Sequence, residues 1–493
     1  MRARSGVRTQ PRRPYLLLSD YAPQNVPAGS SIQHAINEAW NLGADLIVDT
    51  VPGRRPAPYL SNRKLVLPGG WTDGTNFRGR MGRLIGEGWG EFNYDDDFNG
   101  SLTETPVGGL SGSVIKAGPS FTRGTTLLEI GPANWGTVVE GVGFLGNNRA
   151  ARLVHNGSGR VTVRDCGFGD LDTTGVEHTD GLGSWCLLGA PITTAGHGGT
   201  VIGLGTNSEG FLHSHYENLR MSPCTADTQL NLDGEGGGFA LMDSGGYYPT
   251  DCVVRSLYVA TLRNKGGVTA TGIGCLLRGC GGTSLHEYHV TSVSNAADAD
   301  SNYVGLSLDA GNMRISNIYL DTQPLTLSHG QGSAYLRFEN GASRCVVSDV
   351  TIIFPNGWPA GMLAAGAGLF NVDGSTRGNM VHGVSVTNDY YLTAANTPDH
   401  LVRLYNTPSS TTGNEDDGDP ISDGGGDDFN FLIDGVVSEG RPFDTSSYAA
   451  AFGIHNNIGT HTPTGTVQDG ETTWVDVDGT PRLRWRNVIA PVT

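Results

Sequence analysis

Val163-Arg-Asp-Cys-Gly-Phe168 is one copy of a six-residue segment that recurs along this 493-residue chain. Each copy has apolar or small residues at its first, fourth and sixth positions, and usually Gly, Asn or Asp at its third. The copies begin at Val139, Val163, Tyr216, Val254, Leu285, Ile315, Val347, Val381 and, more weakly, Ile433. A repeat of about 30 residues is typical of a solenoid, in which each unit buries its apolar face only against its neighbours.

A second apolar segment precedes most copies by about ten residues, within the strand lengths and short turns usual for β structure. Leu127-Leu-Glu-Ile130 and Tyr335-Leu-Arg-Phe338 are examples, and turns such as Asp309-Ala-Gly311 separate the two segments. Helical periodicity is almost absent from this part of the chain. The pattern predicts an all-β fold in which residues 44–440 form about a dozen coils of a parallel β-helix.

The third position of each copy is predicted to be a bend. Positions one and four both face inward, so the alternation of a regular strand slips by one residue between them. Gly, Asn and Asp tolerate the left-handed backbone that such a slip requires. We therefore interpret Asp165 and Asp349 as corner residues rather than catalytic acids. The steps from Val163 to Tyr216 and from Val381 to Ile433 are unusually long, and we expect one weakly marked coil in each.

The composition excludes some classes of function. The net charge of −17 argues against a general nucleic-acid binder, and no apolar run is long enough for a membrane helix. Lysine occurs three times among 32 basic residues, a bias typical of proteins from salt-adapted hosts; GC-biased codon usage is the alternative. The arginine-rich start lacks the apolar core of a signal peptide. Seven cysteines without CxxC spacing predict buried free thiols rather than a zinc site.

The region before the repeats has its own pattern. Ser31-Ile-Gln-His-Ala-Ile-Asn-Glu-Ala-Trp40 predicts an amphipathic helix capped by Ser30 or Ser31, and strands are expected at 45–49, 64–68, 83–89 and 113–116. This helix, with Lys64-Leu-Val-Leu-Pro-Gly-Gly70 and Leu84-Ile-Gly-Glu-Gly-Trp-Gly90, resembles the opening of pectate-lyase-like right-handed β-helix proteins, notably viral tailspikes. The resemblance implies that the helix caps the open end of the coil and that the coil is right-handed.

Three segments are expected along the chain. Residues 1–29 form a basic arm, residues 30–443 form the β-helix with its helical cap, and residues 444–493 form a C-terminal β cap or oligomer contact. In the last segment, Thr473–Val477 and Arg482–Trp485 flank Asp-Gly-Thr-Pro and predict a β-hairpin.

Glu177, His178 and Asp180 are the candidate catalytic residues, because β-helix enzymes place carboxylates on loops or outer faces as acid and base. Solvated loop residues of an acidic protein form the same pattern, and we favour that alternative. Gly196-His-Gly198 resembles a polygalacturonase motif whose partner segments this chain lacks, so we attribute it to chance.

Glu415, Asp416, Asp417 and Asp419 are the candidate metal ligands, in a glycine-rich acidic stretch suited to Ca²⁺ or another hard cation. The stretch matches no complete calcium-loop pattern, so a hydrated acidic loop is the favoured interpretation. We expect no other cofactor.

The resemblance and the basic arm predict a virion surface protein: a tailspike, tail fibre or capsid spike. The acid-rich, lysine-poor composition predicts that the virus infects a halophilic archaeon. We expect a homotrimer that contacts other virion proteins through the N-terminal arm and recognises host-surface glycan or glycoprotein, without nucleic-acid binding or membrane insertion. It would assemble in the host cytoplasm and be extracellular after release. The alternative is a lyase or glycoside hydrolase that degrades host-surface polysaccharide, and we favour recognition without catalysis.

Overall fold

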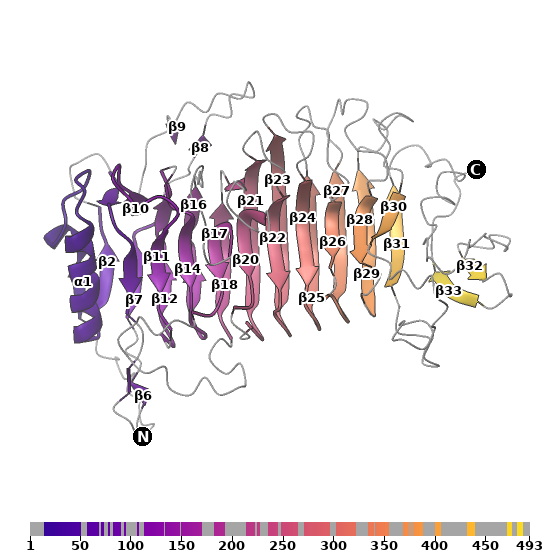
Figure 1. The fold of residues 1–493 in the computed structure, drawn as a ribbon, viewed down its shortest axis with the longest axis horizontal. Helices are drawn as coiled ribbons and strands as arrows, with labels where there is room; N and C mark the ends of the chain where they lie inside the picture. The colour runs from indigo at the N-terminus through magenta and orange to yellow at the C-terminus, as the bar shows by residue number, and fades with distance from the viewer. Residues whose placement is uncertain are drawn as a thin grey trace, which may run out of the picture.

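In the computed structural model, parallel strands stack side by side along the long axis, with one helix at the N-terminal end (Figure 1). The structure describes residues 14–50, 57–68, 71–72, 77–78, 82–89, 93–94, 106–107, 113–132, 134–147, 149–169, 182–192, 213–221, 224–226, 235–244, 248–264, 271–295, 302–321, 334–339, 341–353, 368–373, 376, 378–387, 400–405, 431–438, 471–475 and 481–486. The architecture is the predicted right-handed parallel β-helix.

Sheet A contains 17 strands, and all its pairings are parallel. Its strands are β1 (Tyr15–Leu17), β2 (Asp45–Val48), β3 (Tyr59–Ser61), β7 (Arg83–Gly86), β10 (Val114–Ala117), β12 (Val138–Glu140), β13 (Gly143–Leu145), β15 (Thr162–Arg164), β16 (Gly167–Gly169), β18 (His215–Met221), β19 (Cys224–Ala226), β21 (Val253–Asn264), β23 (Ser284–Asn295), β25 (Arg314–Asp321), β27 (Val346–Ile353), β29 (Asn379–Thr387) and β31 (Phe431–Ser438). The six-residue repeats lie in this sheet.

Successive repeats pair in register, so equivalent residues stack. Val254 lies opposite Leu285, and Ile315 lies opposite Val347. The expectation of two hidden coils is wrong: Val163 pairs directly with Tyr216, and Val381 with Ile433. Each long step therefore spans a single coil, and the additional residues fall in the connections between its strands. Loop insertions are tolerated there because the paired strands, not the connections, set the stacking.

The predicted corner is present at the third position of eight repeats. Its residues all have positive φ angles, between 49° and 68°: Gly141, Asp165, Asn218, Ser256, Glu287, Asn317, Asp349 and Gly383. Because of this bend, positions one, four and six all face the core; in the fourth repeat, Val254, Leu257 and Val259 are at most 1% exposed. Left-handed backbone costs about 1–2 kcal/mol at a residue with a Cβ, which inward packing must offset.

Sheet B contains ten strands and closes the other side of the coil. Its strands are β4 (Leu65–Leu67), β11 (Thr126–Ile130), β14 (Arg152–Asn156), β17 (Ser184–Gly189), β20 (Glu235–Leu241), β22 (Thr271–Arg278), β24 (Asn302–Asp309), β26 (Ala334–Phe338), β28 (Gly368–Asp373) and β30 (His400–Tyr405). Phe239, Leu306, Leu336 and Phe370 point into the core shared with sheet A and are fully buried.

The helix α1 (Gly29–Leu42) packs Ile32, Ala35 and Ile36 against the first coils, as the capping interpretation predicted. The prediction that Ser30 or Ser31 caps the helix is wrong. The helix begins at Gly29, and its N-cap residue Ala28 makes no side-chain hydrogen bond. Tyr15–Leu17, expected within the basic arm, instead pair with β2 as the first strand of sheet A, before the short 3-10 turn η1 (Leu18–Asp20).

Three short antiparallel pairs complete the described strands. They are β5 (Trp71–Thr72) with β6 (Phe77–Arg78), β8 (Asn93–Tyr94) with β9 (Pro106–Val107), and β32 (Glu471–Val475) with β33 (Pro481–Arg486). The last pair is the predicted C-terminal hairpin. In the part of the chain that the structure describes, no helix is long and apolar enough to cross a membrane.

Six of the seven cysteines are buried and form no disulfide, as predicted: Cys166, Cys186, Cys252, Cys275, Cys280 and Cys345. Burial raises the pKa of Cys166 and of Cys252 to about 12, and that of Cys345 to about 11. Thiols with such pKa values carry almost no thiolate near neutral pH, so these side chains act as small core residues.

Candidate functional site

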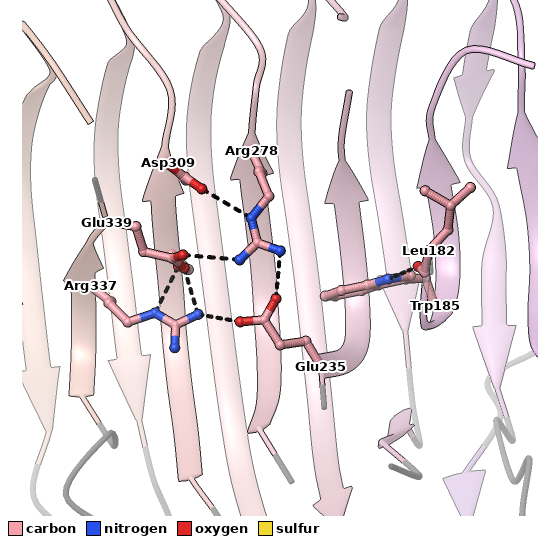
Figure 2. Close-up of polar contacts among 8 residues, drawn as sticks. Leu182, Trp185, Glu235, Arg278, Asp309, Arg337 and Glu339 are labelled. Atoms are coloured by element: carbon pink, nitrogen blue, oxygen red, sulfur yellow. Dashed lines mark hydrogen bonds and ion pairs between the residues drawn. The ribbon is translucent and has the colours of Figure 1, made fainter. Parts of the chain in front are cut away.

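A network of charged side chains lies on the outward face of sheet B and joins four consecutive coils (Figure 2). We call it the charged array; it consists of Glu235, Arg278, Asp309, Arg337 and Glu339. Glu235 begins β20, Arg278 ends β22, Asp309 ends β24, Arg337 lies in β26, and Glu339 follows β26 directly. Because the strands stack in register, Arg278, Asp309 and Glu339 are neighbours on successive coils. Glu235 pairs with Thr271 instead, and its side chain joins the array through ion pairs with the two arginines.

Arg278 is the centre of the charged array. Its guanidinium group lies 2.7 Å from Glu235 Oε2, 3.1 Å from Asp309 Oδ2 and 3.0 Å from Glu339 Oε2. Arg337 adds contacts of 2.8 Å to Glu235 Oε1 and 2.6 Å to Glu339 Oε1. Planar guanidinium groups suit such multiple carboxylate contacts. Two arginines thus hold three carboxylates whose positions span more than 100 residues of sequence.

Neutral donors complete the charged array. The Ser307 hydroxyl donates to Glu339 Oε1, and Arg337 Nε donates to Ser307 Oγ at 3.0 Å. The backbone N–H of Gly341 donates to Asp309 Oδ1 at 2.6 Å. Every carboxylate oxygen of the array therefore has a cationic or hydrogen-bonding neighbour, and the side chains are held in one arrangement.

The pKa values of two carboxyl groups in the charged array are shifted in opposite directions. Burial and the neighbouring Glu339 raise the pKa of Asp309, and the donors Gly341 and Arg278 only partly offset this. For Glu339, burial acts to raise the pKa, but Arg337 and Arg278 outweigh it and lower the pKa. The two carboxyl groups are neighbours on adjacent coils. When their environments shift two pKa values apart, one carboxyl group favours the protonated form of an acid and the other the ionised form of a base.

An apolar patch adjoins the charged array on the same outward face. It comprises Trp185, Leu188, Ile273, Leu276 and Val304, each at most 1% exposed. Trp185 lies opposite Gly237, and its indole N–H donates to Leu182 O at 2.7 Å (Figure 2). A Cβ at Gly237 would lie 2.0 Å from Ile273 O, so this position of the patch requires glycine.

The sequence-predicted site residues do not belong to the charged array. Glu177, His178 and Asp180, and likewise Glu415, Asp416, Asp417 and Asp419, lie outside the described residues, so they stay predictions. Within the described ranges, no group of three or more His, Cys, Asp or Glu side chains is arranged to hold a metal ion. In the charged array itself, the two guanidinium groups occupy the space between the carboxylates.

Sequence reasoning missed the charged array, although a signal for it was present. Aligned on their inward residues, the second strands of successive coils carry Arg278, Asp309 and Glu339 at equivalent outward positions. Opposite charges at the same position of neighbouring coils indicate a ladder of ion pairs. Asp309 was instead interpreted only as a turn residue.

No family model and no curated protein matches this chain. Among solved structures, it is similar to tailspike protein 2 of an Escherichia coli O157:H7 bacteriophage (8% identity, TM-score 0.44, 81% of this chain and 42% of that one). It is also similar to the catalytic unit of a GH87 α-1,3-glucanase from Streptomyces thermodiastaticus (13%, 0.39, 88% and 70%) and to the Dettilon tailspike (11%, 0.34, 79% and 68%). The chain thus spans less than half of the first tailspike, and its fold assignment rests on its own strand pairing.

Proposed function

We propose that this chain is a virion surface protein of the tailspike type that recognises a host-surface glycan through the outward face of sheet B. The observation that supports this most is the charged array. Its side chains are 12–22% exposed and are fixed by one another on rigid strands. A glycan needs both donors and acceptors in fixed positions, and groups already held in place lose less conformational entropy on binding.

The virion assignment is supported by the sequence of the N-terminal cap, which resembles that of tailspikes. In this proposal, residues 1–13 dock to other virion proteins and residues 444–493 seal a homotrimer, which assembles in the host cytoplasm and reaches the outside on release. The acidic, lysine-poor composition supports a halophilic archaeal host. The connections 170–181 and 193–212, which precede and follow β17, are proposed to contribute further contacts.

A binding assay tests this proposal. Fluorescently labelled full-length chain is incubated with a panel of haloarchaeal cells in high salt, and bound fluorescence is measured for the wild type, Glu235→Gln and Arg337→Lys. Glu235→Gln removes the negative charge, and Arg337→Lys keeps the positive charge but loses the planar guanidinium group. Binding should fall in both variants, while circular dichroism stays unchanged. Glu217→Gln, the same change at an exposed residue of sheet A outside the charged array, is the matched control. Unchanged binding by both array variants would remove the charged array from the recognition site.

A second candidate function is cleavage of the same glycan, and the geometry of Asp309 and Glu339 favours it specifically. The two carboxyl groups are neighbours on adjacent coils, share Arg278, and have pKa values shifted apart. A general acid and a carboxylate base or nucleophile are the requirements for glycoside hydrolysis. Release of reducing ends from envelope polysaccharide would establish this candidate if Asp309→Asn and Glu339→Gln each abolish it. Binding without release by the wild type would reject it.

A further inference from the structure

A stack of aromatic rings lies on the outward face of sheet A, on the other side of the core from the charged array. Tyr258, His289 and Tyr319 occupy the fifth position of three successive repeats and pair in register. The ring centroids of Tyr258 and His289 are 5.0 Å apart and those of His289 and Tyr319 are 4.2 Å apart, both edge to face. We call these three residues the aromatic ladder. All three are partly exposed.

Polar and charged side chains border the aromatic ladder. The guanidinium group of Arg220 lies 5.1 Å from the ring centroid of Tyr258 at one end. Thr351 continues the same row at the other end, opposite Tyr319. Asp321, two residues after Tyr319, raises the pKa of Tyr319 together with burial of the phenol. Beside the first ring, the Tyr258 and Thr291 hydroxyl groups are 3.4 Å apart.

The chemistry of this face distinguishes it from an ordinary protein contact. Protein interfaces are apolar at their centre and polar at their rim. Here the aromatic row is only one side chain wide. The exposed corner residues Asn317 and Asp349 come next on the far side from Thr291, and Ser316 and Ser348 lie beyond this bend. Such a face offers ring surfaces and hydroxyl groups together along the axis of the coil.

We propose that the aromatic ladder is a second glycan subsite, which binds an uncharged oligosaccharide lying along the β-helix axis across three coils. The C–H groups of a pyranose carry partial positive charge and meet the negative faces of the tyrosine rings, as other positive groups do. Sugar hydroxyl groups exchange hydrogen bonds with the Thr291, Thr351 and Asp321 side chains. The identity of the biological ligand rests on the proposed function, whereas the capacity to bind a neutral oligosaccharide is argued from the residues of this face.

Isothermal titration calorimetry on the full-length chain tests the aromatic ladder directly. The probes are cellohexaose, maltohexaose and laminarihexaose as neutral oligosaccharides, with an oligogalacturonate as the acidic contrast. We expect at least one neutral probe to bind, and we expect Tyr258→Ala/Tyr319→Ala to weaken it by about tenfold or more, since aromatic anchors dominate such contacts. Tyr319→Phe, which keeps the ring face, should stay within about threefold of the wild type. Affinity should persist in about 1 M salt, where charge attraction is screened within about 3 Å.

The outcomes separate this subsite from the charged array. Loss of binding in the Tyr→Ala double variant but not in Arg337→Lys supports the subsite, whatever the cell assay gives. Loss in Arg337→Lys alone leaves the proposed function intact and overturns the subsite. Failure of every neutral probe to bind the wild type also overturns it. Unchanged affinity of the double variant would overturn the subsite as well. A double variant whose sedimentation mass changes while its affinity does not would identify the aromatic ladder as a contact between copies of the chain.

Discussion

The outward faces of sheets A and B are built on the same coils but carry different chemistry. On sheet B, the charged array joins residues of four coils by ion pairs and leaves each side chain about one-fifth exposed or less. On sheet A, the aromatic ladder stacks rings that stay partly exposed. Below both faces, the inward positions are mostly apolar, with a few buried polar side chains such as Asn156. A solenoid therefore constrains its inward positions by packing and leaves the outward ones to be set by function or by neighbouring coils.

The largest effect is expected from a change that removes the support common to both faces. Val350 is 1% exposed in the core, and Val350→Asp would bury a carboxylate without a partner. The variant should fail to fold, as judged by circular dichroism and proteolysis. Ser348→Asp places the same carboxylate on the outward face of the same strand and should leave the free energy of unfolding within about 0.5 kcal/mol. Equal damage by both would contradict the inward and outward assignment of β27.

Arg278→Ala tests whether the charged array stabilises sheet B more than outward charges stabilise sheet A. Removal of the central guanidinium group leaves Asp309 without its ion pair and weakens the hold on Glu235 and Glu339. Because the group is one-fifth exposed, we expect a loss of about 2–3 kcal/mol, less than for a fully buried pair. The exposed Arg255 of sheet A is the matched control, and Arg255→Ala should cost about 0.5 kcal/mol or less. Chemical denaturation of the two variants measures both values.

The corner at the third position of the repeat lies in sheet A, and Asp349 tests it. At φ 56°, a β-branched side chain is strained, so Asp349→Val should lower the free energy of unfolding by about 1–2 kcal/mol. Asp349→Gly should be neutral or stabilising at the same site, because glycine adopts this backbone freely. If the valine variant were as stable as the glycine variant, the corner would not require left-handed backbone.

The smallest effect concerns acid, to which two carboxyl groups of sheet B should respond in opposite ways. The pKa of Glu339 is lowered on folding, so its contribution to stability is complete above its ordinary value of 4.5 and is lost as pH falls through the lowered value. The pKa of Asp309 is raised from 3.8, so the opposite holds for this group. Its contribution to stability is complete below 3.8 and is lost as pH rises through the raised value. In urea titrations between pH 3 and 6, Glu339→Gln should therefore flatten the loss of stability in acid, and Asp309→Asn should steepen it. Parallel curves for both variants and the wild type would contradict these shifts.

The repeat was enough to predict the coil because its signal is local. The residue type at the third position predicts the bend, because Gly141, Asn218 and Asp349 tolerate left-handed backbone. Ser256 and Glu287 take the same backbone without that preference, and only their place in the register reveals it. The N-cap of α1 was not predictable in this way, because two serines beside Gly29 offered a local solution that the packing of the first coil did not use.

The sequence by itself determined the parallel β-helix, its corners and its buried thiols, because each depends on residues within one coil or on a pattern repeated in every coil. The capping role of the helix followed from the resemblance of its sequence to other β-helix proteins. Tertiary structure alone decided which outward side chains of non-adjacent coils meet. Glu235 and Arg337 are 102 residues apart, and their 2.8 Å contact depends on how many coils lie between them. The two long steps show a similar limit elsewhere in the chain: a long connection and a hidden coil contain similar numbers of residues, and only strand pairing distinguishes them.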